Sequence, residues 1–310
     1  MSEVREIVYG HNIPPVNKTA GEVVDHLMEG AIDMHMHAGP DPGVARWDPY
    51  DIACAARDHG MRAVVLKSFL YPTAIQADML KNLVPEVDMI GSVTIGQETT
   101  MGLAYAKEVI ELNAKLGAKV VWFPAMDAEF FRKERGLSGG IKIIDEQGKL
   151  KEEVYKILEV IKKYELVLCS GHMEYIETET LFKQAREMGI TKMVATHPQV
   201  NEWTPMTLTQ MKTLAGMGAY IEHCGLQLTA RSGSMHPTRF VEITKEIGAE
   251  HCIMSTDFGW ASEAVEAEAM RSFVGSMMMF GCTEEEIDYM IRKNPMKLLG
   301  LPERYVAATA

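Results

Sequence analysis

Short apolar runs rich in Val and Ile alternate with longer amphipathic segments from residue 30 onward, and this alternation limits the fold more than any other feature. Eight runs have the length and composition of strands. Strands that alternate with helices form a parallel sheet, and eight such units predict a closed (β/α)8 barrel. No GxGxxG or phosphate-loop pattern opens the first helix, which weakens the open-sheet alternative. The predicted strands are residues 31–38, 62–69, 88–95, 119–126, 166–171, 192–197, 219–223 and 252–257.

The segments between these runs have the apolar spacing of helices. Glycines stand just before several of the following runs, at Gly60, Gly117, Gly189 and Gly218, as expected for helix C-caps. The clearest predicted helices are residues 101–116, 152–164, 178–188, 207–217 and 237–247.

One segment does not follow the alternation. Residues 127–150, after the fourth strand, predict a small hairpin insertion that turns at residues 145–148. Its neighbours Phe130, Phe131 and Arg132 either cover the barrel mouth or lie in a plain surface hairpin.

The C-terminal region predicts an extra helix packed on the barrel. Thr283 and Glu286 have the spacing of a capping box at its start. We expect residues 1–29 to form an N-terminal segment and residues 30–310 to form a single barrel domain.

Composition excludes several classes of partner. The formal net charge of -12 and the absence of a basic run argue against nucleic acid. The five cysteines are scattered and never form a CxxC pair, which favours reduced thiols. The N-terminus lacks a signal-peptide pattern, and no apolar stretch is long enough to cross a membrane. We therefore expect a cytoplasmic protein that acts on a small molecule and forms a homo-oligomer.

The first strand carries an unusual polar stripe. In the sequence IDMHMHAG, Asp33, His35 and His37 occupy alternate positions, so they would share one face of a strand. Buried polar groups are costly without a partner, and a bound cation is one such partner. Because barrel active sites lie at the carboxyl ends of the strands, the residues at the other ends are candidates too. They are Lys67, His172, His197, Glu222, His223 and Asp257.

This ordered set resembles the amidohydrolase superfamily of metal-dependent hydrolases, in an uncharacterised branch. The shared features are an HxH pair on the first strand, single histidines on the fifth and sixth, and an aspartate on the eighth. The C-terminal NPMKLLGL is similar to a tail found in many members, so the resemblance covers about residues 30–301. It implies a divalent metal, most often zinc, with manganese or iron as alternatives. The implied ligands are His35, His37, His172, His197 and Asp257.

The fourth strand departs from the commonest pattern of this superfamily. Binuclear members carry a carboxylated lysine or a glutamate there, whereas this strand reads KVVWFPAMD, with Asp127 a marginal substitute. Either the site holds one metal, or Lys67 on the second strand is carboxylated and bridges two. The favoured alternative for Lys67 is binding of an anionic substrate group, or pairing with Glu98 or Glu222.

Four further residues are expected near the site. Glu222 and His223 are predicted to contact substrate, although strand alternation lets only one of them face the interior. Arg231 could clamp a substrate carboxylate or remain solvated. Asp33 is expected to orient a ligand histidine or to cap backbone amides.

The resulting hypothesis is a hydrolase that cleaves a C–N or C–O acyl bond in an amide, cyclic amide or lactone. Metal-bound hydroxide would attack a carbonyl polarised by the metal and His197, and Asp257 would carry the proton. Three alternatives stay open: a non-hydrolytic decarboxylase of the same superfamily, a phosphoesterase similar to histidinol phosphatase, and an inactive barrel that serves as a scaffold or sensor.

Overall fold

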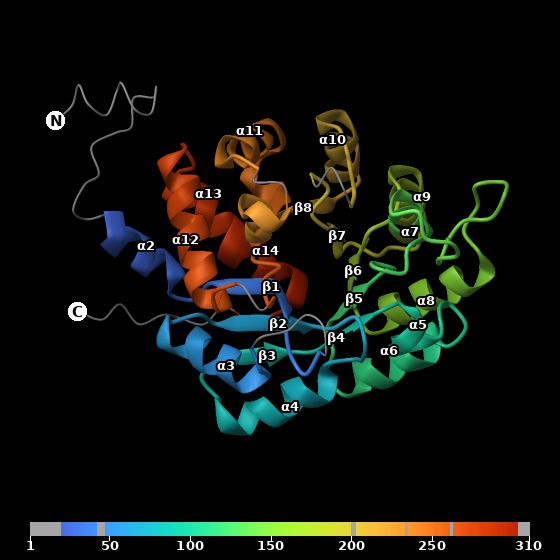
Figure 1. Ribbon diagram of the computed structural model, residues 1–310, viewed down its shortest axis with the longest axis horizontal. Coiled ribbons are helices and arrows are strands. Elements are labelled where there is room, and N and C mark those ends of the chain that lie inside the picture. The colour runs from blue at the N-terminus through green and yellow to red at the C-terminus, as the bar shows by residue number, and fades with distance from the viewer. Residues whose placement is uncertain (1–19, 42–46, 200–202, 233–234, 261–262, 303–310) are drawn as a thin grey trace.

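The computed structural model describes residues 20–41, 47–199, 203–232, 235–260 and 263–302, and its strands are all parallel (Figure 1). They form two sheets, with the orders β1-β2-β3 and β4-β5-β6-β7-β8-β9. The bounds are β1 Ile32–His37, β2 Ala63–Lys67, β3 Asp88–Ile90, β4 Ser92–Thr94, β5 Val120–Trp122, β6 Val167–Cys169, β7 Met193–Ala195, β8 Ala219–Cys224 and β9 Cys252–Ser255.

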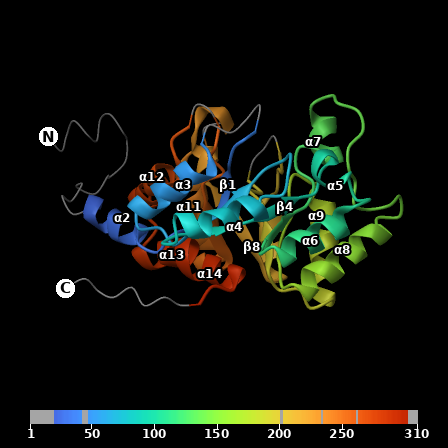
Figure 2. The same ribbon diagram turned by 90° about the horizontal axis from the view of Figure 1, so that it is seen from below.

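Helices surround these strands on the outside (Figures 1 and 2). The α-helices are α2 Ala20–Met28, α3 Pro49–Asp58, α4 Ala74–Leu83, α5 Gln97–Thr100, α6 Ala106–Lys115, α7 Glu129–Glu134, α8 Glu152–Lys163, α9 Tyr175–Glu187, α10 Leu208–Gly216, α11 Pro237–Ile247, α12 Glu266–Met279, α13 Glu284–Asp288 and α14 Asn294–Leu299. Short 3-10 turns η1 Gly225–Leu228, η2 Ala230–Ser232 and η3 Ala249–His251 follow β8 and precede β9, and a π-helical turn, η4 Tyr289–Lys293, joins α13 to α14.

Each of the eight predicted strands is present, but the third is divided into β3 and β4 at Gly91. A Cβ atom on Gly91 would lie 2.4 Å from the Cα atom of Ala74, so the start of α4 packs directly on this backbone. Thr73 Oγ1 and Ser92 Oγ both donate to the carbonyl of Leu66, at 2.7 and 2.6 Å. These side chains replace ladder hydrogen bonds between β2 and β4, and the sheet is interrupted there.

The first and last strands also approach each other. Asp257 N donates to His35 O at 2.7 Å, and His37 N donates to Phe258 O at 2.8 Å. A parallel bridge joins Met36 to Phe258, just beyond the end of β9. Contact between β1 and the segment after β9 therefore lies among the predicted metal ligands.

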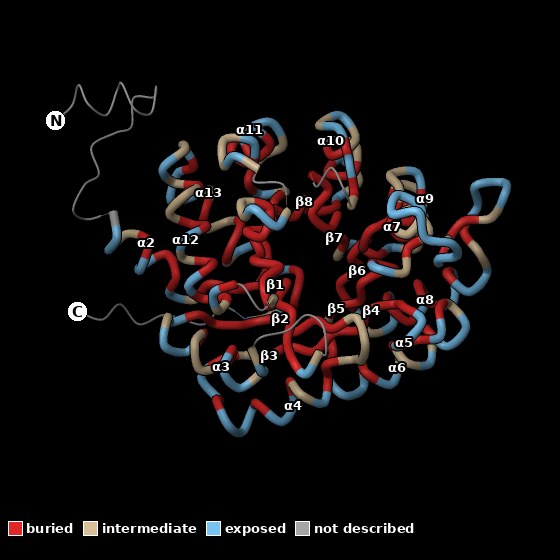
Figure 3. The backbone as a smooth tube through the Cα atoms, in the orientation of Figure 1, coloured by how far each residue is buried: buried red, intermediate tan, exposed pale blue. Residues whose placement is uncertain are grey.

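Alternate strand residues enter two separate apolar clusters. On β2, Val64 and Leu66 pack outward against the helices, whereas Ala63 and Val65 pack inward. The inner cluster takes residues from every strand except β4, and Leu298 and Leu299 of α14 also belong to it. Figure 3 shows the strands as the most continuously buried part of the chain.

One predicted helix was wrong at its start. The helix expected over residues 101–116 begins only at Ala106, as α6, and a turn separates it from the short α5 that precedes residue 101. Met101 and Gly102 have positive φ angles of 49° and 67°, and this left-handed backbone ends α5. The predicted glycine C-caps are confirmed, since Gly60 and Gly189 have φ angles of 70° and 85°.

The insertion after the fourth predicted strand is more helical than the sequence suggested, and the C-terminal region is helical as expected. Residues 127–150 contain α7, and the predicted turn closes where Gly148 N donates to Asp145 O at 3.1 Å. The predicted C-terminal helix is α13, the π-helical turn and α14, and the Thr283–Glu286 capping box is confirmed.

The expected N-terminal segment falls largely outside the described residues, since residues 1–19 are not among them. Its described part, α2, buries Leu27 and Met28 in the outer cluster. Among the helices that the structure describes, none combines the length and the apolar character that a membrane-spanning segment requires.

Candidate metal centre

The predicted ligand residues meet at the carboxyl ends of the strands. His35 and His37 lie on β1, and His172, His197 and Asp257 follow β6, β7 and β9 by two or three residues. All five are buried, with at most 4% of each residue exposed. The structure therefore brings together every residue that the sequence proposed as a metal ligand.

Asp257 is the centre of this group. Its Oδ1 atom lies 2.9 Å from His35 Nε2 and 3.1 Å from His37 Nε2, and its Oδ2 atom lies 3.9 Å from His197 Nε2. His172 Nε2 is 3.2 Å from His197 Nε2. The Nε2 atoms of four histidines thus converge near one carboxylate.

The electrostatic environment keeps most of these imidazoles neutral. Burial lowers the pKa of His37 and that of His197 to about 4, and it lowers the pKa of His172 well below its usual value. Burial alone would raise the pKa of Asp257, but the charge of His35 and hydrogen bonds from His35 and His37 outweigh it and hold that pKa well below the usual value. Neutral imidazole and ionised carboxylate are the forms that bind metal.

His35 differs from the other histidines. Burial lowers its pKa, but the carboxylates of Asp257 and Glu222 outweigh burial and raise the pKa to about 9. In the metal-free cluster, His35 is the positive group between two carboxylates. A divalent cation on the Nε2 side of His35 would supply the positive charge in its place. Imidazole nitrogens together with one carboxylate oxygen are suitable zinc ligands. Three of these residues, His35, His37 and Asp257, have ligand atoms that all lie within 4.8 Å of one another. The residues present therefore fit a divalent metal.

Glu222 on β8 supports two of the histidines. Its carboxylate oxygens lie 3.2 and 3.3 Å from His35 Nδ1, and Oε2 accepts a hydrogen bond from His197 N at 3.3 Å. A carboxylate on the far nitrogen of a ligand histidine fixes the orientation of the ring. The prediction that Glu222 contacts substrate does not fit this position, because its oxygens face His35 and it does not line the cavity above the cluster.

Cys224 lies behind the same histidine. Its Sγ atom is 4.0 Å from His35 Nδ1, and His35, Glu222 and Cys224 form a second group with metal-ligand spacing. Burial raises the pKa of the Cys224 thiol well above its usual value. The thiolate is the metal-binding form, so this second group is the weaker candidate.

Asp33 connects β1 to the segment that carries Asp257. Its Oδ1 atom accepts hydrogen bonds from His35 N at 3.0 Å and from Thr256 N at 3.1 Å, and Thr256 Oγ1 donates to Oδ2. Asp33 thus holds the backbone beside two predicted ligands, in the positioning role expected from the sequence.

The backbone at the cluster is strained. His197 and Asp257 have positive φ angles of 28° and 55°, and they are two of the four described non-glycine residues in that region. Such conformations cost roughly 1–2 kcal/mol for L-residues. A Cβ atom on Gly259 would lie 2.1 Å from His37 O, so only glycine permits this close approach after Asp257. Strain of this kind is concentrated at functional sites.

Lys67 reaches the cluster from β2. Its Nζ atom is 2.8 Å from His35 Nε2 and lies 5.0 Å from the ring centroids of Phe69 and Trp122. Burial lowers the pKa of Lys67, while the charges of Asp257 and Glu222 oppose that shift. Glu98 is exposed and makes no recorded contact with the buried Lys67, so the predicted Lys67–Glu98 pair is wrong.

His223 does not belong to the cluster. Gln199 Nε2 donates to His223 Nδ1 at 2.9 Å, and His223 Nε2 donates to Thr244 Oγ1 of α11 at 3.1 Å. The ring packs on Phe240, with centroids 4.9 Å apart. Alternation along β8 sends Glu222 inward and His223 toward the helix layer, so the predicted contact of His223 with substrate is wrong.

A cavity of about 170 Å³ opens above the cluster. His37, His172 and Asp257 reach it from below. Its walls are aromatic and apolar, and two arginines border it: Phe69, Met126, Phe131, Trp203, Leu226, Trp260, Arg135 and Arg231. The Arg231 guanidinium lies 3.4 Å from the Trp260 ring centroid.

The sequence predicted only part of this wall. Arg231 and Phe131 were expected at the barrel mouth, whereas Arg135, Trp203 and Trp260 were missed. Trp203 and Trp260 follow His197 and Asp257 by six and three residues, and that proximity was the available signal. Phe130 lines a different hollow, and Arg132 donates to Ser138 O at 2.9 Å.

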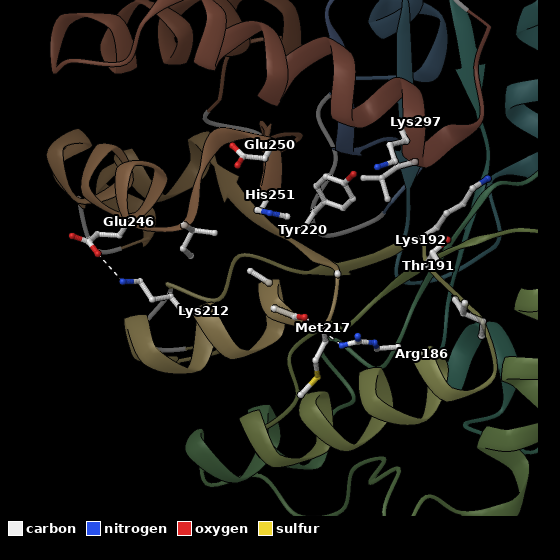
Figure 4. Close-up of a pocket in the computed structure, with 16 residues that line it drawn as sticks. Arg186, Thr191, Lys192, Lys212, Met217, Tyr220, Glu246, Glu250, His251 and Lys297 are labelled. Carbon is white, nitrogen blue, oxygen red and sulfur yellow. Dashed lines mark hydrogen bonds and ion pairs between the residues drawn. The ribbon is translucent and has the colours of Figure 1, made fainter.

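A larger hollow of about 830 Å³ lies at the opposite ends of the strands (Figure 4). It is lined by residues that precede β7 and β8, such as Lys192 and Gly218. Several of its basic groups are already bound: Lys212 pairs with Glu246 at 2.6 Å, and Arg186 donates to Gly216 O at 3.3 Å. It contains none of the clustered ligand residues.

Comparison with known proteins places the chain in a family. A family model matches residues 30–222 and is described as a family of unknown function, DUF6282. The chain belongs to this family. Among curated proteins, none matches the sequence.

Solved structures of hydrolases share the fold of this DUF6282 member. A probable dipeptidase, PvdM, from Pseudomonas aeruginosa has a TM-score of 0.62 at 12% identity, over 91% of this chain and 98% of that chain. A putative 2-pyrone-4,6-dicarboxylic acid hydrolase from Pseudomonas putida has a TM-score of 0.58 at 16% identity, over 89% and 99%. An amidohydrolase from Pseudomonas aeruginosa has a TM-score of 0.61 at 10% identity, over 90% and 98%. The resemblance to the amidohydrolase superfamily is confirmed at the level of the fold.

The buried ring of His223 makes stability depend on pH. Burial lowers its pKa to about 3, against the opposing charge of Glu222. Below pH ~6.5 the unfolded chain binds a proton that the folded chain does not, so we expect the free energy of unfolding to fall as pH falls toward 3, by up to ~1.4 kcal/mol per pH unit from this group. Urea denaturation at pH 7 and pH 5, with chelator present, measures the loss, and His223→Asn should reduce it.

The matched control for this experiment is His26→Gln, because the His26 side chain is 71% exposed. We expect this variant to keep the wild-type dependence on pH. Equal losses in His223→Asn and wild type would contradict the assignment. Some loss should remain in His223→Asn, because the cluster histidines also have lowered pKa values.

Proposed function

We propose that this protein is a metal-dependent hydrolase that cleaves a C–N or C–O acyl bond in a small molecule. The observation that carries the proposal is the contact of Asp257 Oδ1 with the Nε2 atoms of both HxH histidines, directly below a cavity of about 170 Å³. The hydrolase names of the structural neighbours support the reaction class.

We further infer that the two sheets are parts of one (β/α)8 barrel, formed by residues 30–310. The inner apolar cluster supports closure, because β1 and β9 both contribute to it along with the strands between them. The hydrogen bonds of Thr73 and Ser92 span one interruption, and those between β1 and the segment after β9 span the other. Site residues at the carboxyl ends of the strands agree with this architecture.

A bound divalent metal, most often zinc in such a set, would polarise a carbonyl and lower the pKa of water toward ~7. Asp257 would accept a proton from the attacking water and return it to the leaving nitrogen or oxygen. The low pKa of Asp257 keeps its carboxylate ionised. The carboxylate could therefore accept the proton once the pKa of the water had been lowered.

The hydrogen bonds of His197 favour a ligand role over polarisation of the substrate carbonyl. Thr204 Oγ1 donates to His197 O at 2.8 Å, so its oxygen is left to accept from His197 Nδ1, 3.3 Å away. A proton on Nδ1 leaves the Nε2 lone pair free to bind a cation. His35 has the same arrangement, with Nδ1 against Glu222. We therefore assign His35, His37, His172, His197 and Asp257 as the ligands.

The cavity favours a small, flat, acidic substrate. An apolar cavity of roughly 150 Å³ holds a benzene ring, so a cavity of about 170 Å³ suits a single ring such as a lactone or cyclic amide. Aromatic walls pack well on a planar ring. Arg231 at the border offers a planar set of donors that matches a carboxylate. One structural neighbour is named as a putative hydrolase of a pyrone dicarboxylic acid, which has these properties.

A decarboxylase is the second candidate, and one observation favours it. Asp127, the acidic residue near the end of β5, accepts a hydrogen bond from Gln97 N at 2.8 Å and does not join the cluster. The cluster therefore has no bridging carboxylate from that strand, which is the ligand set expected of a mononuclear decarboxylase. Release of CO₂ in place of a hydrolysed product would identify this reaction.

The purified protein should contain about one divalent metal ion per chain, measured by inductively coupled plasma mass spectrometry. The double variant His35→Asn, His37→Asn should lose the metal and the hydrolysis of lactones, cyclic amides and N-acyl compounds, because two ligands are removed. His26→Ala, at an exposed position, should retain both. A wild-type protein that contains no metal and takes up neither zinc nor manganese would refute the proposed function.

The metal count should not change in Lys67→Ala. Lys67 Nζ contacts His35 Nε2 and not a second ligand group, so we expect it to act as a charge beside the cluster. The measurement is metal content after equilibration with zinc in bicarbonate buffer. A fall from two ions in wild type to one or none in the variant would show instead that a carboxylated Lys67 bridges two metals.

Arg231→Gln should raise KM for a substrate that bears a carboxylate by roughly 10- to 100-fold, since hydrogen bonds to charged groups contribute about 1.5–3 kcal/mol. The KM of its neutral methyl ester should change little. Arg239→Gln on α11, an exposed arginine that pairs with Glu242 at 3.3 Å, is the control. Equal effects on the acid and the ester would exclude recognition of the carboxylate by Arg231.

A further inference from the structure

Exposed apolar side chains concentrate on one side of the molecule. Thirteen large apolar residues are exposed among those the structure describes, and eight of them belong to α3, α4, α5 and α6 or to the caps of these helices. We call these eight the apolar face: Tyr50, Ile75, Met79, Leu83, Met101, Tyr105, Leu112 and Leu116. Figure 2 shows α3, α4 and α6 side by side.

Helix α4 has apolar residues on two opposite sides. Ala74, Ala77 and Leu80 are buried against the strands. Ile75, Met79 and Leu83 follow at intervals of four residues, so they form a single stripe, and they are 61% to 63% exposed. A helix that is apolar on its outer side is expected to be covered by another surface.

Helix α8, another outer helix, does not share this stripe. The outer side of α8 carries Glu152 and Lys156, which form an ion pair at 2.7 Å, and its most exposed large apolar residue is Tyr155, at 37%. The stripe on α4 is therefore specific to one side and not a consequence of a uniformly apolar surface.

The helices of the apolar face are joined at one edge. Helix α4 approaches the end of α6 through Lys81. Its Nζ atom lies 3.6 Å from the position that a Cβ atom on Gly117 would occupy, and Gly117 directly follows Leu116. Lys81 also pairs with Asp78 at 2.8 Å, so these charges on α4 neutralise each other. Helix α4 thus carries no formal net charge in a chain whose net charge is -12.

We propose that the apolar face is the interface of a homodimer, with a second copy of this chain as its occupant. Each of the eight side chains is 41% to 65% exposed. A large side chain presents roughly 150–250 Å² when fully exposed, so the eight together present on the order of 800 Å². Each partner in a typical stable interface buries about 800 Å², so the face matches one half of a dimer. In a dimer with twofold symmetry, the α4 stripe of one protomer packs against the α4 stripe of its partner.

The dimer leaves the candidate active site accessible. None of the described residues that line the cavity above the metal ligands lies on α3, α4 or α6. A second copy is preferred over a charged partner, because the two charges of α4 already pair with each other and leave a charged partner nothing to bind there. Two chains of charge -12 can associate at such a contact because the contact itself carries few charges.

Size-exclusion chromatography with multi-angle light scattering tests the proposal on the full chain at about 1, 10 and 100 μM. We expect a mass of twice 34.6 kDa for wild type and of 34.6 kDa for the triple variant Ile75→Glu, Met79→Glu, Leu83→Glu. Glutamate is a good helix former, so α4 should persist at these exposed positions. Far-ultraviolet circular dichroism and metal content check that the variant is folded.

The matched control replaces three exposed apolar residues outside the face, as Tyr155→Glu, Ile176→Glu and Met279→Glu. This variant should remain a dimer. A monomeric wild type at 100 μM would overturn the proposal, and so would a folded α4 variant that remains dimeric. If the triple variant fails to fold, the single variant Met79→Glu should instead weaken dimerisation at least tenfold, and an unchanged dissociation constant would overturn the proposal.

Discussion

The contact of Asp257 with the surrounding histidines is the interaction on which the site depends. An ionised carboxylate is expensive to bury unless opposite charge and hydrogen bonds surround it. Here His35 carries positive charge between the carboxylates of Asp257 and Glu222, all within the buried ends of the strands. The cluster remains in the interior because each of these charges has an opposite charge close by.

The strands could be predicted from the sequence because they depend on short-range periodicity, whereas the proposed ligand set rests on the resemblance to the amidohydrolase superfamily. Alternation along IDMHMHAG placed His35 and His37 on one side, and the structure has both against Asp257. Alternation could not say which of Glu222 and His223 faces inward. That choice depends on Thr244 and Phe240, which are distant in sequence and receive the His223 ring in the helix layer.

The features that sequence reasoning missed depend on loops and on close backbone contacts. Trp203, Trp260 and Arg135 line the cavity from irregular segments, whose paths no periodicity describes. The division of the third strand follows from the approach of Ala74 to Gly91, a tertiary contact. The helix predicted from Met101 begins only at Ala106, because the left-handed backbone of Met101 overrode the helical pattern of the side chains. In each instance the deciding contact is distant or unusual in geometry.

The hydrogen bond from Thr256 N to Asp33 Oδ1 joins residues 223 positions apart in the chain. The first and last strands must therefore both be in place before Asp257 meets the HxH histidines. A growing polypeptide on the ribosome has no complete set of the proposed ligands until nearly all of the strands have been synthesised. An ion bound at this junction, as proposed, could not guide early folding. It would act later, by slowing the separation of the two ends of the chain, so it would protect the finished protein chiefly through its rate of unfolding.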